Sequence, residues 1–260
     1  MAKFFVASDI HSAYTPWMKS LRDAGFDKNN PEHKVVVCGD LFDRMDETVR
    51  VYNFAKEMDE LGRFIYVKGN HESLLFDCMK EIKRGVIPSS HHFHNGTIKT
   101  ICQLCGESEW IVYDPTWRDK IVATMQPVLD WIEKKCVDYF EVGDFVCVHG
   151  WVPCYQELDD FRDATKADWE RARWDNGMKM WSNPACRVDG KTVICGHWHC
   201  SWGWSHLKQL RKEFPPTNRK DWEKSFEPFV EAGIIAIDAC IAYSGLCNVI
   251  VIEEDNDGDN

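Results

Sequence analysis

Short polar clusters follow several apolar runs along the chain, and their residue types are those that bind divalent metals. The clusters read D-x-H, G-D-x-x-D-R, G-N-H-E, V-H-G and G-H-x-H, at residues 9–11, 39–44, 69–72, 148–150 and 196–199. A mixed set of carboxylate, imidazole and carboxamide ligands suits Mn, Fe or Zn better than Ca or a thiolate zinc site. The clusters therefore indicate a divalent-metal site.

Each cluster comes directly after a β-branched run that is typical of a buried strand, such as KFFVA, VVVC, FIYV, FVCV or TVIC. Two more strands are expected at residues 234–237 and 248–252. Helical spacing of apolar residues predicts helices over residues 46–61 and 117–135, the second kinked or broken at Pro127. Strand and helix alternate, so we expect parallel pairing, with ligands gathered at the carboxyl ends of the strands.

Composition limits the class of protein. A chain of 260 residues with 44% hydrophobic residues can form one α/β domain. We predict a single domain over residues 1–252 and a disordered acidic tail over residues 253–260. The net charge of −11 argues against stable nucleic-acid binding. The first apolar run is too short for a signal peptide or membrane span, so we expect a cytoplasmic protein whose twelve cysteines are mostly buried, reduced thiols.

Taken in order, the clusters resemble the motif set of the calcineurin-like metallophosphoesterases. Longer blocks resemble the phosphoprotein phosphatase branch of that family, in particular its small prokaryotic and phage-type Ser/Thr protein phosphatases: GDLFDR, GNHE, YFEVGDFVCVHGWVP and IDACIAYSGLCNVIVI. The resemblance covers most of the chain. It implies an α/β fold with a central β-sandwich of two mixed sheets flanked by helices. His199 departs from the eukaryotic phosphatases and matches the broader family, and Ala239 stands where many members have Thr-Gly.

The resemblance also implies a dinuclear metal centre, with Mn2+ as the metal most suited in vitro and Fe or Zn as alternatives. Two such ions would share a bridging hydroxide that attacks phosphorus in line. The first metal would be held by Asp9, His11, Asp40 and His199, and the second by Asp40, Asn70, His149 and His197.

His71 lies next to the ligand Asn70 and is the candidate general acid. By resemblance, Asp43 hydrogen-bonds His71 and holds it protonated, and Asn70 also contacts substrate. Arg44 can fork onto phosphate oxygens, although Asp43 and Arg44 could instead form a surface ion pair.

A second phosphate-binding arginine is expected between V-H-G and G-H-x-H, and we select Arg173 over Arg171. We interpret the histidines at 91, 92 and 94 as a polar surface loop rather than ligands. Four tryptophans adjoin the clusters, where they could line a substrate rim or pack the core: Trp151, Trp198, Trp202 and Trp204.

The leading hypothesis is a metal-dependent phosphomonoesterase, most readily a protein phosphatase acting on phosphoserine, phosphothreonine or phosphotyrosine. Its partner would be a phosphorylated protein or a small phosphoester, with no membrane involved. The alternative is a dinucleoside polyphosphate (diadenosine tetraphosphate) hydrolase, and a third reading is a catalytically silent metal-binding or scaffold protein. Retention of all expected ligands together with His71, Asp43 and Arg44 favours an enzyme.

Overall fold

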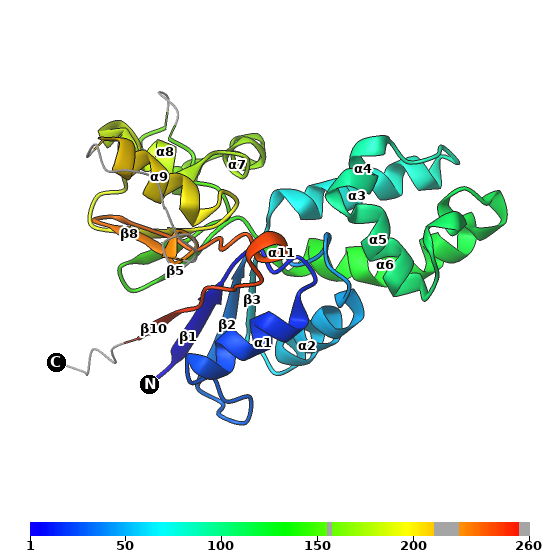
Figure 1. Cartoon of the computed structure of the whole chain (residues 1–260), viewed down its shortest axis with the longest axis horizontal. Helices are drawn as coiled ribbons and strands as arrows, with labels where there is room; N and C mark the ends of the chain where they lie inside the picture. Colours follow the sequence, from blue (N-terminus) through cyan, green and yellow to red (C-terminus); the bar gives the residue numbers. More distant parts are fainter. Residues whose placement is uncertain (155–157, 211–223, 255–260) are drawn as a thin grey trace.

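Two mixed five-stranded sheets pack face to face, and helices cover both outer faces (Figure 1). The computed structural model describes residues 1–154, 158–210 and 224–254. Sheet A has the order β10-β1-β2-β3-β4, and its strands are β1 Lys3–Ala7, β2 His33–Cys38, β3 Phe64–Val67, β4 Cys136–Val137 and β10 Ile250–Glu253. Sheet B has the order β5-β6-β7-β9-β8, and its strands are β5 Phe140–Val142, β6 Phe145–Cys147, β7 Thr192–Cys195, β8 Phe229–Glu231 and β9 Ile234–Ala236.

The inner strands of each sheet are parallel, and antiparallel strands lie at the edges. Strands β1 to β4 run parallel, as do β6, β7 and β9, whereas β10, β5 and β8 pair antiparallel with their neighbours. The parallel strands therefore end at a common edge of each sheet, which is where the polar clusters follow them.

Alternation along the strands divides the core into layers. In β1, Phe4 and Val6 face sheet B, while Phe5 and Ala7 face the helices that cover sheet A. Successive side chains of a strand point to opposite faces, so a strand covered on both sides must be apolar throughout. This explains the continuous apolar runs in the sequence.

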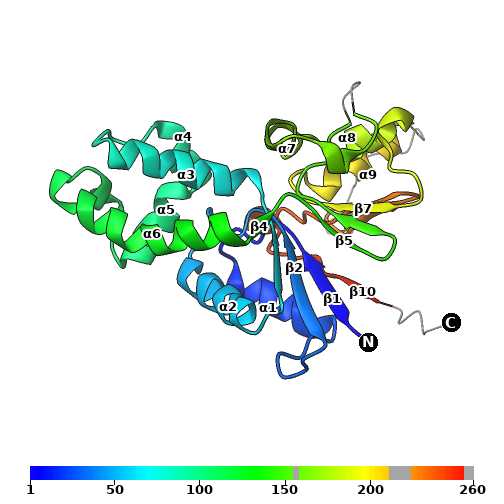
Figure 2. The same cartoon turned by 180° about the vertical axis from the view of Figure 1, so that it is seen from behind.

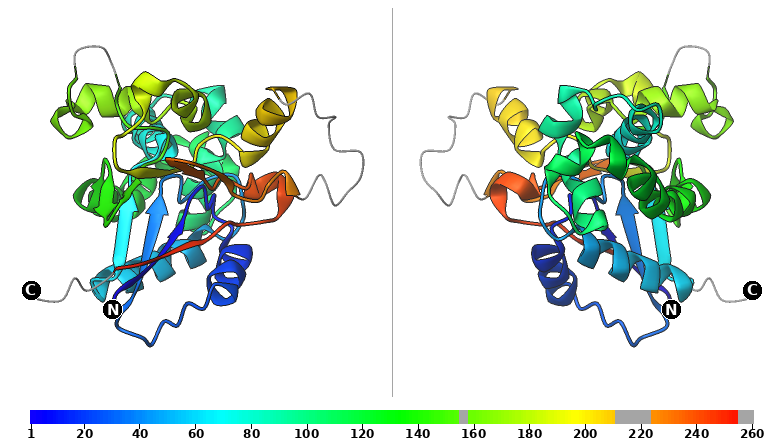
Figure 3. Two further views of the ribbon diagram at one scale, coloured as in Figure 1. Left: turned by 90° about the vertical axis from the view of Figure 1, so that its left-hand side faces the viewer. Right: turned by 90° about the vertical axis from the view of Figure 1, so that its right-hand side faces the viewer.

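The helices form three groups, which Figures 2 and 3 show from other sides. Sheet A is covered by α1 Tyr14–Asp23 and α2 Thr48–Glu60. A helical arm to one side contains α3 Asn70–Lys83, α4 Ser90–Asn95, α5 Thr97–Cys105, η1 Glu109–Val112, η2 Pro115–Trp117 and α6 Arg118–Lys135. Sheet B carries η3 Phe161–Asp163, α7 Lys166–Ala172, α8 Gly177–Ser182, η4 Pro184–Cys186 and α9 Cys200–Leu210, and α11 Ile241–Ser244 follows β9.

The predicted fold class is confirmed, and all of the predicted strands are present close to their expected bounds. Both predicted helices exist as well, and α6 continues unbroken through Pro127. Strands β4, β5 and β8, of two or three residues each, were not predicted. All twelve cysteines are free and most are buried, as predicted.

One expectation differs from the structure. The histidines at 91, 92 and 94 belong to helix α4 rather than to a loop, and His92 is fully buried. Strand β10 extends through Glu253, which pairs in register with Lys3. Residues 255–260 of the predicted tail lie outside the described residues. Within the described part, every helix is too short or too polar to cross a bilayer.

Candidate metal centre

A pocket of about 210 Å³ opens where the carboxyl ends of β1, β2 and β3 meet those of β7 and β9. Its wall contains most of the predicted site residues, namely Asp9, His11, Asp40, Arg44, Asn70, His71, His197 and His199. His149 and Asp43 are buried and contact that wall through Asn70 and His71 respectively. Residues far apart in sequence and from both sheets therefore meet at one point.

Asp40 lies at the centre of the cluster, with two histidines near one of its carboxylate oxygens and a third near the other. Its Oδ2 atom is 3.8 Å from Nε2 of His11 and 3.8 Å from Nε2 of His71. Its Oδ1 atom is 3.4 Å from Nε2 of His149. Two sets of closely spaced donor atoms share Asp40, one with His11 and His71 and the other with His149 and His197. A carboxylate so placed can bridge two cations.

Asp9 and Asn70 extend the two sets. Oδ1 of Asp9 is 3.9 Å from Nε2 of His11, and its Oδ2 accepts hydrogen bonds from Ser8 Oγ and from the backbone N–H of His197. Oδ1 of Asn70 lies 2.8 Å from Nε2 of His149. The side chains are thus held close together and aimed at a common volume.

His199 lines the same pocket but stands apart from both sets. Its side chain is 51% exposed, and its Nε2 is 3.9 Å from Oδ2 of Asp238. Asp238 is buried in the pocket wall, and its Oδ1 accepts the backbone N–H of Cys240. Asp238 is a carboxylate that the sequence motifs left without a role.

Glu72 fixes the loops that carry these groups. Its carboxylate accepts hydrogen bonds from the backbone N–H groups of Asp40, Leu41 and Gly69 and from the hydroxyl of Tyr66. It sits in the first turn of α3, where an acceptor for free N–H groups stabilises the helix start. Glu72 therefore joins the turn after β2 to the turn after β3.

The loops have an unusual backbone. Every described non-glycine residue with positive φ lies in a loop at the site: Asp9, His11, Ser12, Asp40, Asp43, Arg44, His197 and Cys240. Such conformations cost free energy and cluster at functional sites, where surrounding contacts hold them. Glycine is required beside them, because a Cβ on Gly69 would lie 2.2 Å from Oδ1 of Asp40, and one on Gly196 would lie 2.2 Å from Oδ2 of Asp9.

Electrostatics in the cluster favour bound cations. Burial raises the pKa of Asp9 to about 6 and that of Asp40 to about 7 and outweighs the neighbouring histidines, which lower them, so neither carboxylate is fully compensated by positive charge. Burial lowers the pKa of His11 and His149, and burial together with His149 lowers that of His197 to about 3. Neutral imidazoles beside uncompensated carboxylates are the donor set of a divalent metal site. The residues present therefore fit two divalent ions that share Asp40.

His71, Asp43 and Arg44 form one connected group beside this centre. Nδ1 of His71 is 2.7 Å from Oδ2 of Asp43, and its Nε2 is 3.3 Å from Nη2 of Arg44. Burial would lower the pKa of His71, but the charge of Asp40 and the hydrogen bond to Asp43 outweigh it and raise that pKa to about 9. The imidazole can therefore carry a proton at neutral pH.

Arg173 is not brought into this cluster. Its guanidinium is buried, ion-paired with Asp138 and with Glu170, and lines a separate cavity beside α3 and α7. The neighbouring Trp174 lines the site pocket instead, with its ring centroid 5.9 Å from that of His197. Of the tryptophans singled out from the sequence, Trp151 is buried in the core, and Trp198 is 41% exposed and packs edge-on against His197.

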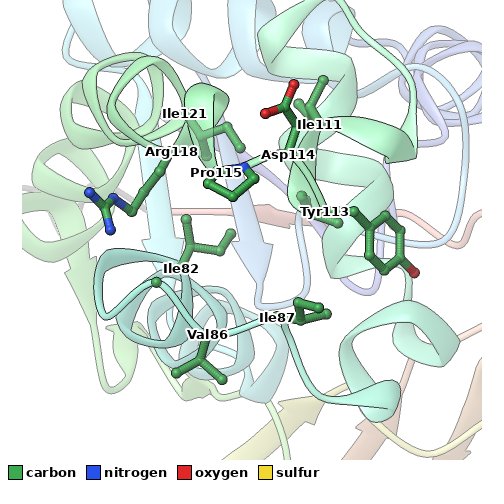
Figure 4. Close-up of a pocket in the computed structure, with 11 residues that line it drawn as sticks. Ile82, Val86, Ile87, Ile111, Tyr113, Asp114, Pro115, Arg118 and Ile121 are labelled. Atoms are coloured by element: carbon green, nitrogen blue, oxygen red, sulfur yellow. The ribbon is translucent and has the colours of Figure 1, made fainter.

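The helical arm holds a smaller pocket of a different kind (Figure 4). Its wall is mainly aliphatic and aromatic, with Ile82, Val86, Ile87 and Tyr113 around it and Asp114 and Arg118 as its charged residues. Isolated charges of that kind offer no cluster of metal donors. Among the described residues, the closely spaced candidate metal donors lie instead in and beside the pocket at the strand ends.

Comparison with known proteins agrees with this geometry. Residues 2–230 match the family model of the calcineurin-like phosphoesterases. The chain belongs to this family of metal-dependent phosphoesterases, whose members use a dinuclear metal centre. No curated protein sequence matches the chain significantly.

Solved structures with related folds include several phosphatases. A cold-active protein-tyrosine phosphatase of a Shewanella species superposes with a TM-score of 0.52 at 13% identity, over 97% of this chain and 76% of that one. A structure provisionally assigned as a diadenosine tetraphosphatase gives a TM-score of 0.44 at 13% identity, over 98% of this chain and 95% of that one. A Saccharomyces cerevisiae protein serine/threonine phosphatase gives a TM-score of 0.45 at 15% identity, over 76% of this chain and 61% of that one. Likeness at such identities concerns the fold alone.

Replacement of the shared carboxylate should weaken metal binding. We predict that Asp40→Asn lowers affinity for Mn2+ by roughly tenfold or more, because the amide replaces a negative oxygen ligand in both sets. Metal analysis after dialysis, and the Mn2+-induced rise in melting temperature, measure the change. The exposed Asp119→Asn provides the matched control and should bind as wild type. Equal metal content in the two variants would contradict the assignment.

The metal-free protein should lose stability as pH rises from about 6.5 to 9. The folded pKa values of Asp40, Asp238 and His71 are raised to about 7, 8 and 9, above the unfolded values of 3.8 and 6.5, so the folded chain alone keeps these protons. The lowered pKa values of His11, His149 and His197 act in the opposite direction, but this effect ends about one pH unit above 6.5, where the unfolded histidines have lost their protons. Urea unfolding in EDTA across this interval checks the sign. A free energy of unfolding that increases with pH there would refute it.

Proposed function

We propose that this chain is a phosphomonoesterase that acts on phosphorylated proteins, with His71 as general acid. The observation that carries the proposal is the His71–Asp43–Arg44 group, which lies against Asp40 in the same pocket. Two divalent cations held by the proposed ligands would lower the pKa of the attacking water and offset the charge on the phosphoryl group.

The residues of the chain supply the remaining parts of the reaction. Arg44 is exposed at the pocket wall, where its guanidinium can bind phosphoryl oxygens by two parallel hydrogen bonds. Nε2 of His71 faces the same space and can donate its proton to the departing oxygen, while Asp43 fixes the ring through Nδ1. An alkoxide leaving group needs that proton most.

The charge around the pocket supports a monoester rather than a dinucleoside polyphosphate. Among the described residues that line it, Arg44 is the single lysine or arginine, and the chain as a whole carries a net charge of −11. A chain of several phosphates would meet little positive charge outside the metal centre. One terminal phosphoryl group needs no more than Arg44 and the two metals.

The mouth of the pocket supports an aromatic substrate. Trp174 is 51% exposed, and Ile241 and Ala242 lie in the same wall. An exposed indole at this position can stack on the ring of phosphotyrosine or of an aryl phosphate. This function therefore includes a preference for phosphotyrosine over phosphoserine.

Replacement of the proposed acid should separate catalysis from metal binding. We expect His71→Asn to retain both metals and to lower kcat by roughly a hundredfold for phosphoserine peptides and phenyl phosphate. The loss should be much smaller for 2,4-dinitrophenyl phosphate, whose leaving group needs no proton. Asp43→Asn should behave similarly but more mildly. Loss of metal from His71→Asn would instead make His71 a ligand, in line with its closeness to Asp40.

A substrate comparison tests the remainder of the proposal. After chelation and reconstitution, with Mn2+ expected to restore most activity, kcat/KM should be higher for p-nitrophenyl phosphate and phosphotyrosine peptides than for diadenosine tetraphosphate. Trp174→Ala should lower kcat/KM for phosphotyrosine by about tenfold and spare phosphoserine. Trp198→Ala is the matched control, since Trp198 also packs edge-on against His197 but lies outside the pocket wall. A tenfold preference for the dinucleotide would favour the alternative hydrolase.

A further inference from the structure

Helix α5 packs its first turns against the loop that carries Asp43 and Arg44. We call this contact the α5 clamp and define it by Gly96, Thr97, Lys99, Thr100 and Gln103. The helix belongs to the arm outside the two sheets, and none of these five residues is a proposed ligand. Their contacts nevertheless converge on the proposed acid group.

The α5 clamp supplies hydrogen-bond donors to both carboxylate oxygens of Asp43. Thr97 Oγ1 donates to Oδ2 over 3.0 Å, and Thr100 Oγ1 donates to Oδ1 over 2.7 Å. The backbone N–H of Asp43 donates in turn to Thr100 Oγ1 over 2.9 Å. Both threonines are fully buried and lie three residues apart, on one face of the helix. Each oxygen of Asp43 therefore has a hydroxyl donor, and Oδ2 also meets His71.

The clamp also holds a strained backbone in place. Asp43 and Arg44 are consecutive non-glycine residues with φ of 78° and 62°. Such residues persist only where neighbouring contacts determine them. A Cβ on Gly96 would lie 2.2 Å from N and 2.8 Å from Cα of Arg44. Gly96 thus allows the start of α5 to press directly on this turn.

Two further side chains of α5 hold the loop beyond the turn. Lys99 Nζ donates to the carbonyl of Arg44 over 3.1 Å. Gln103 Nε2 donates to the carbonyl of Met45, and its Oε1 accepts the N–H of Thr48, each over 2.9 Å. The loop is therefore bonded to α5 along its length rather than at one point.

We propose that the α5 clamp positions the proton donor, with Thr97 and Thr100 as positioning residues that act through Asp43. The inference rests on the proposed role of His71 as general acid. A carboxylate held by one donor on each oxygen cannot rotate, so Oδ2 stays aimed at Nδ1 of His71 and the opposite ring nitrogen stays aimed into the pocket. Proton transfer depends steeply on such alignment.

Removal of the hydroxyls tests the clamp directly. Thr97→Val and Thr100→Val keep side-chain shape but remove the hydroxyl donor to one oxygen of Asp43. We expect each to lower kcat for phenyl phosphate by about tenfold, with little change in KM or in kcat for 2,4-dinitrophenyl phosphate. Thr97→Ser and Thr100→Ser retain the hydroxyl and should stay within about threefold of wild type.

The two ends of α5 offer a matched pair of backbone variants. Gly96 and Gly106 both have positive φ, 87° and 70°, so alanine introduces similar strain at either position. A Cβ on Gly106 meets nothing within 4 Å, whereas one on Gly96 meets the backbone of Arg44. Gly96→Ala should therefore reproduce the leaving-group-dependent loss, and Gly106→Ala should not.

The α5 clamp can also be tested by NMR, without any measurement of activity. In the metal-free protein, the Nδ1 proton of His71 that bonds Asp43 should give a low-field NMR resonance, assigned by its loss in His71→Asn. The valine variants should shift or broaden this resonance, and the serine variants should restore it.

Failure of the clamp can be told from failure of the proposed function. If His71→Asn shows the leaving-group effect but the valine variants keep both the wild-type resonance and wild-type kcat, the clamp is refuted and the function stands. If His71→Asn has no such effect, the function fails, and the resonance alone decides whether the threonines hold Asp43 against His71. Equal losses in Gly96→Ala and Gly106→Ala would also count against the clamp.

Discussion

The site depends on one buried carboxylate, that of Glu72, which accepts four hydrogen bonds inside the protein. Three donors are backbone N–H groups from two different loops, and the fourth is the hydroxyl of Tyr66. A carboxylate has about four lone-pair directions, so this one is fully used. The turn after β2 carries Asp40, and the turn after β3 leads into α3, whose first two residues are Asn70 and His71. Without Glu72, unpaired N–H groups would remain buried in both turns, and the metal donors would lose their spacing.

The strained loops and the electrostatics of the pocket follow from this arrangement. Short side chains such as Asp9 and Asp40 reach a common centre only if the backbone turns sharply at the strand ends, which explains the positive φ angles. Crowding them there removes water from the carboxylates and raises their pKa values. Backbone strain and buried charge therefore both lower the stability of the protein at this site. Bound cations would offset the unfavourable burial of the charged carboxylates.

Sequence reasoning succeeded where the signal was local. The strands were predictable because apolar runs ended in Gly-Asp, Gly-Asn-His or Gly-His, and the side chains that follow them do converge in the structure. The roles of residues that reach the site through packing between distant elements were not predicted. These residues are Glu72, which joins two loops, Thr97 and Thr100 on α5, Asp238 after β9, and Trp174 after α7. Arg173, which was selected from the sequence over Arg171, lines a separate cavity, whereas the adjacent Trp174 lines the site pocket. The side that each of these neighbouring side chains faces depends on the orientation of one turn, and no spacing rule encodes it.

The two sheets contribute unequal shares of the proposed metal donors, and this division has a thermodynamic consequence. Asp9, His11, Asp40 and Asn70 follow strands of sheet A, whereas His149, His197 and His199 follow strands of sheet B. A cation held by both groups couples the unfolding of the two sheets, and its contribution to folding grows with the logarithm of its free concentration. The apolar layer between the sheets couples them as well, so a bound cation would add a second link between the two halves. Cellular metal supply would then contribute to the cooperativity of folding as well as to the chemistry.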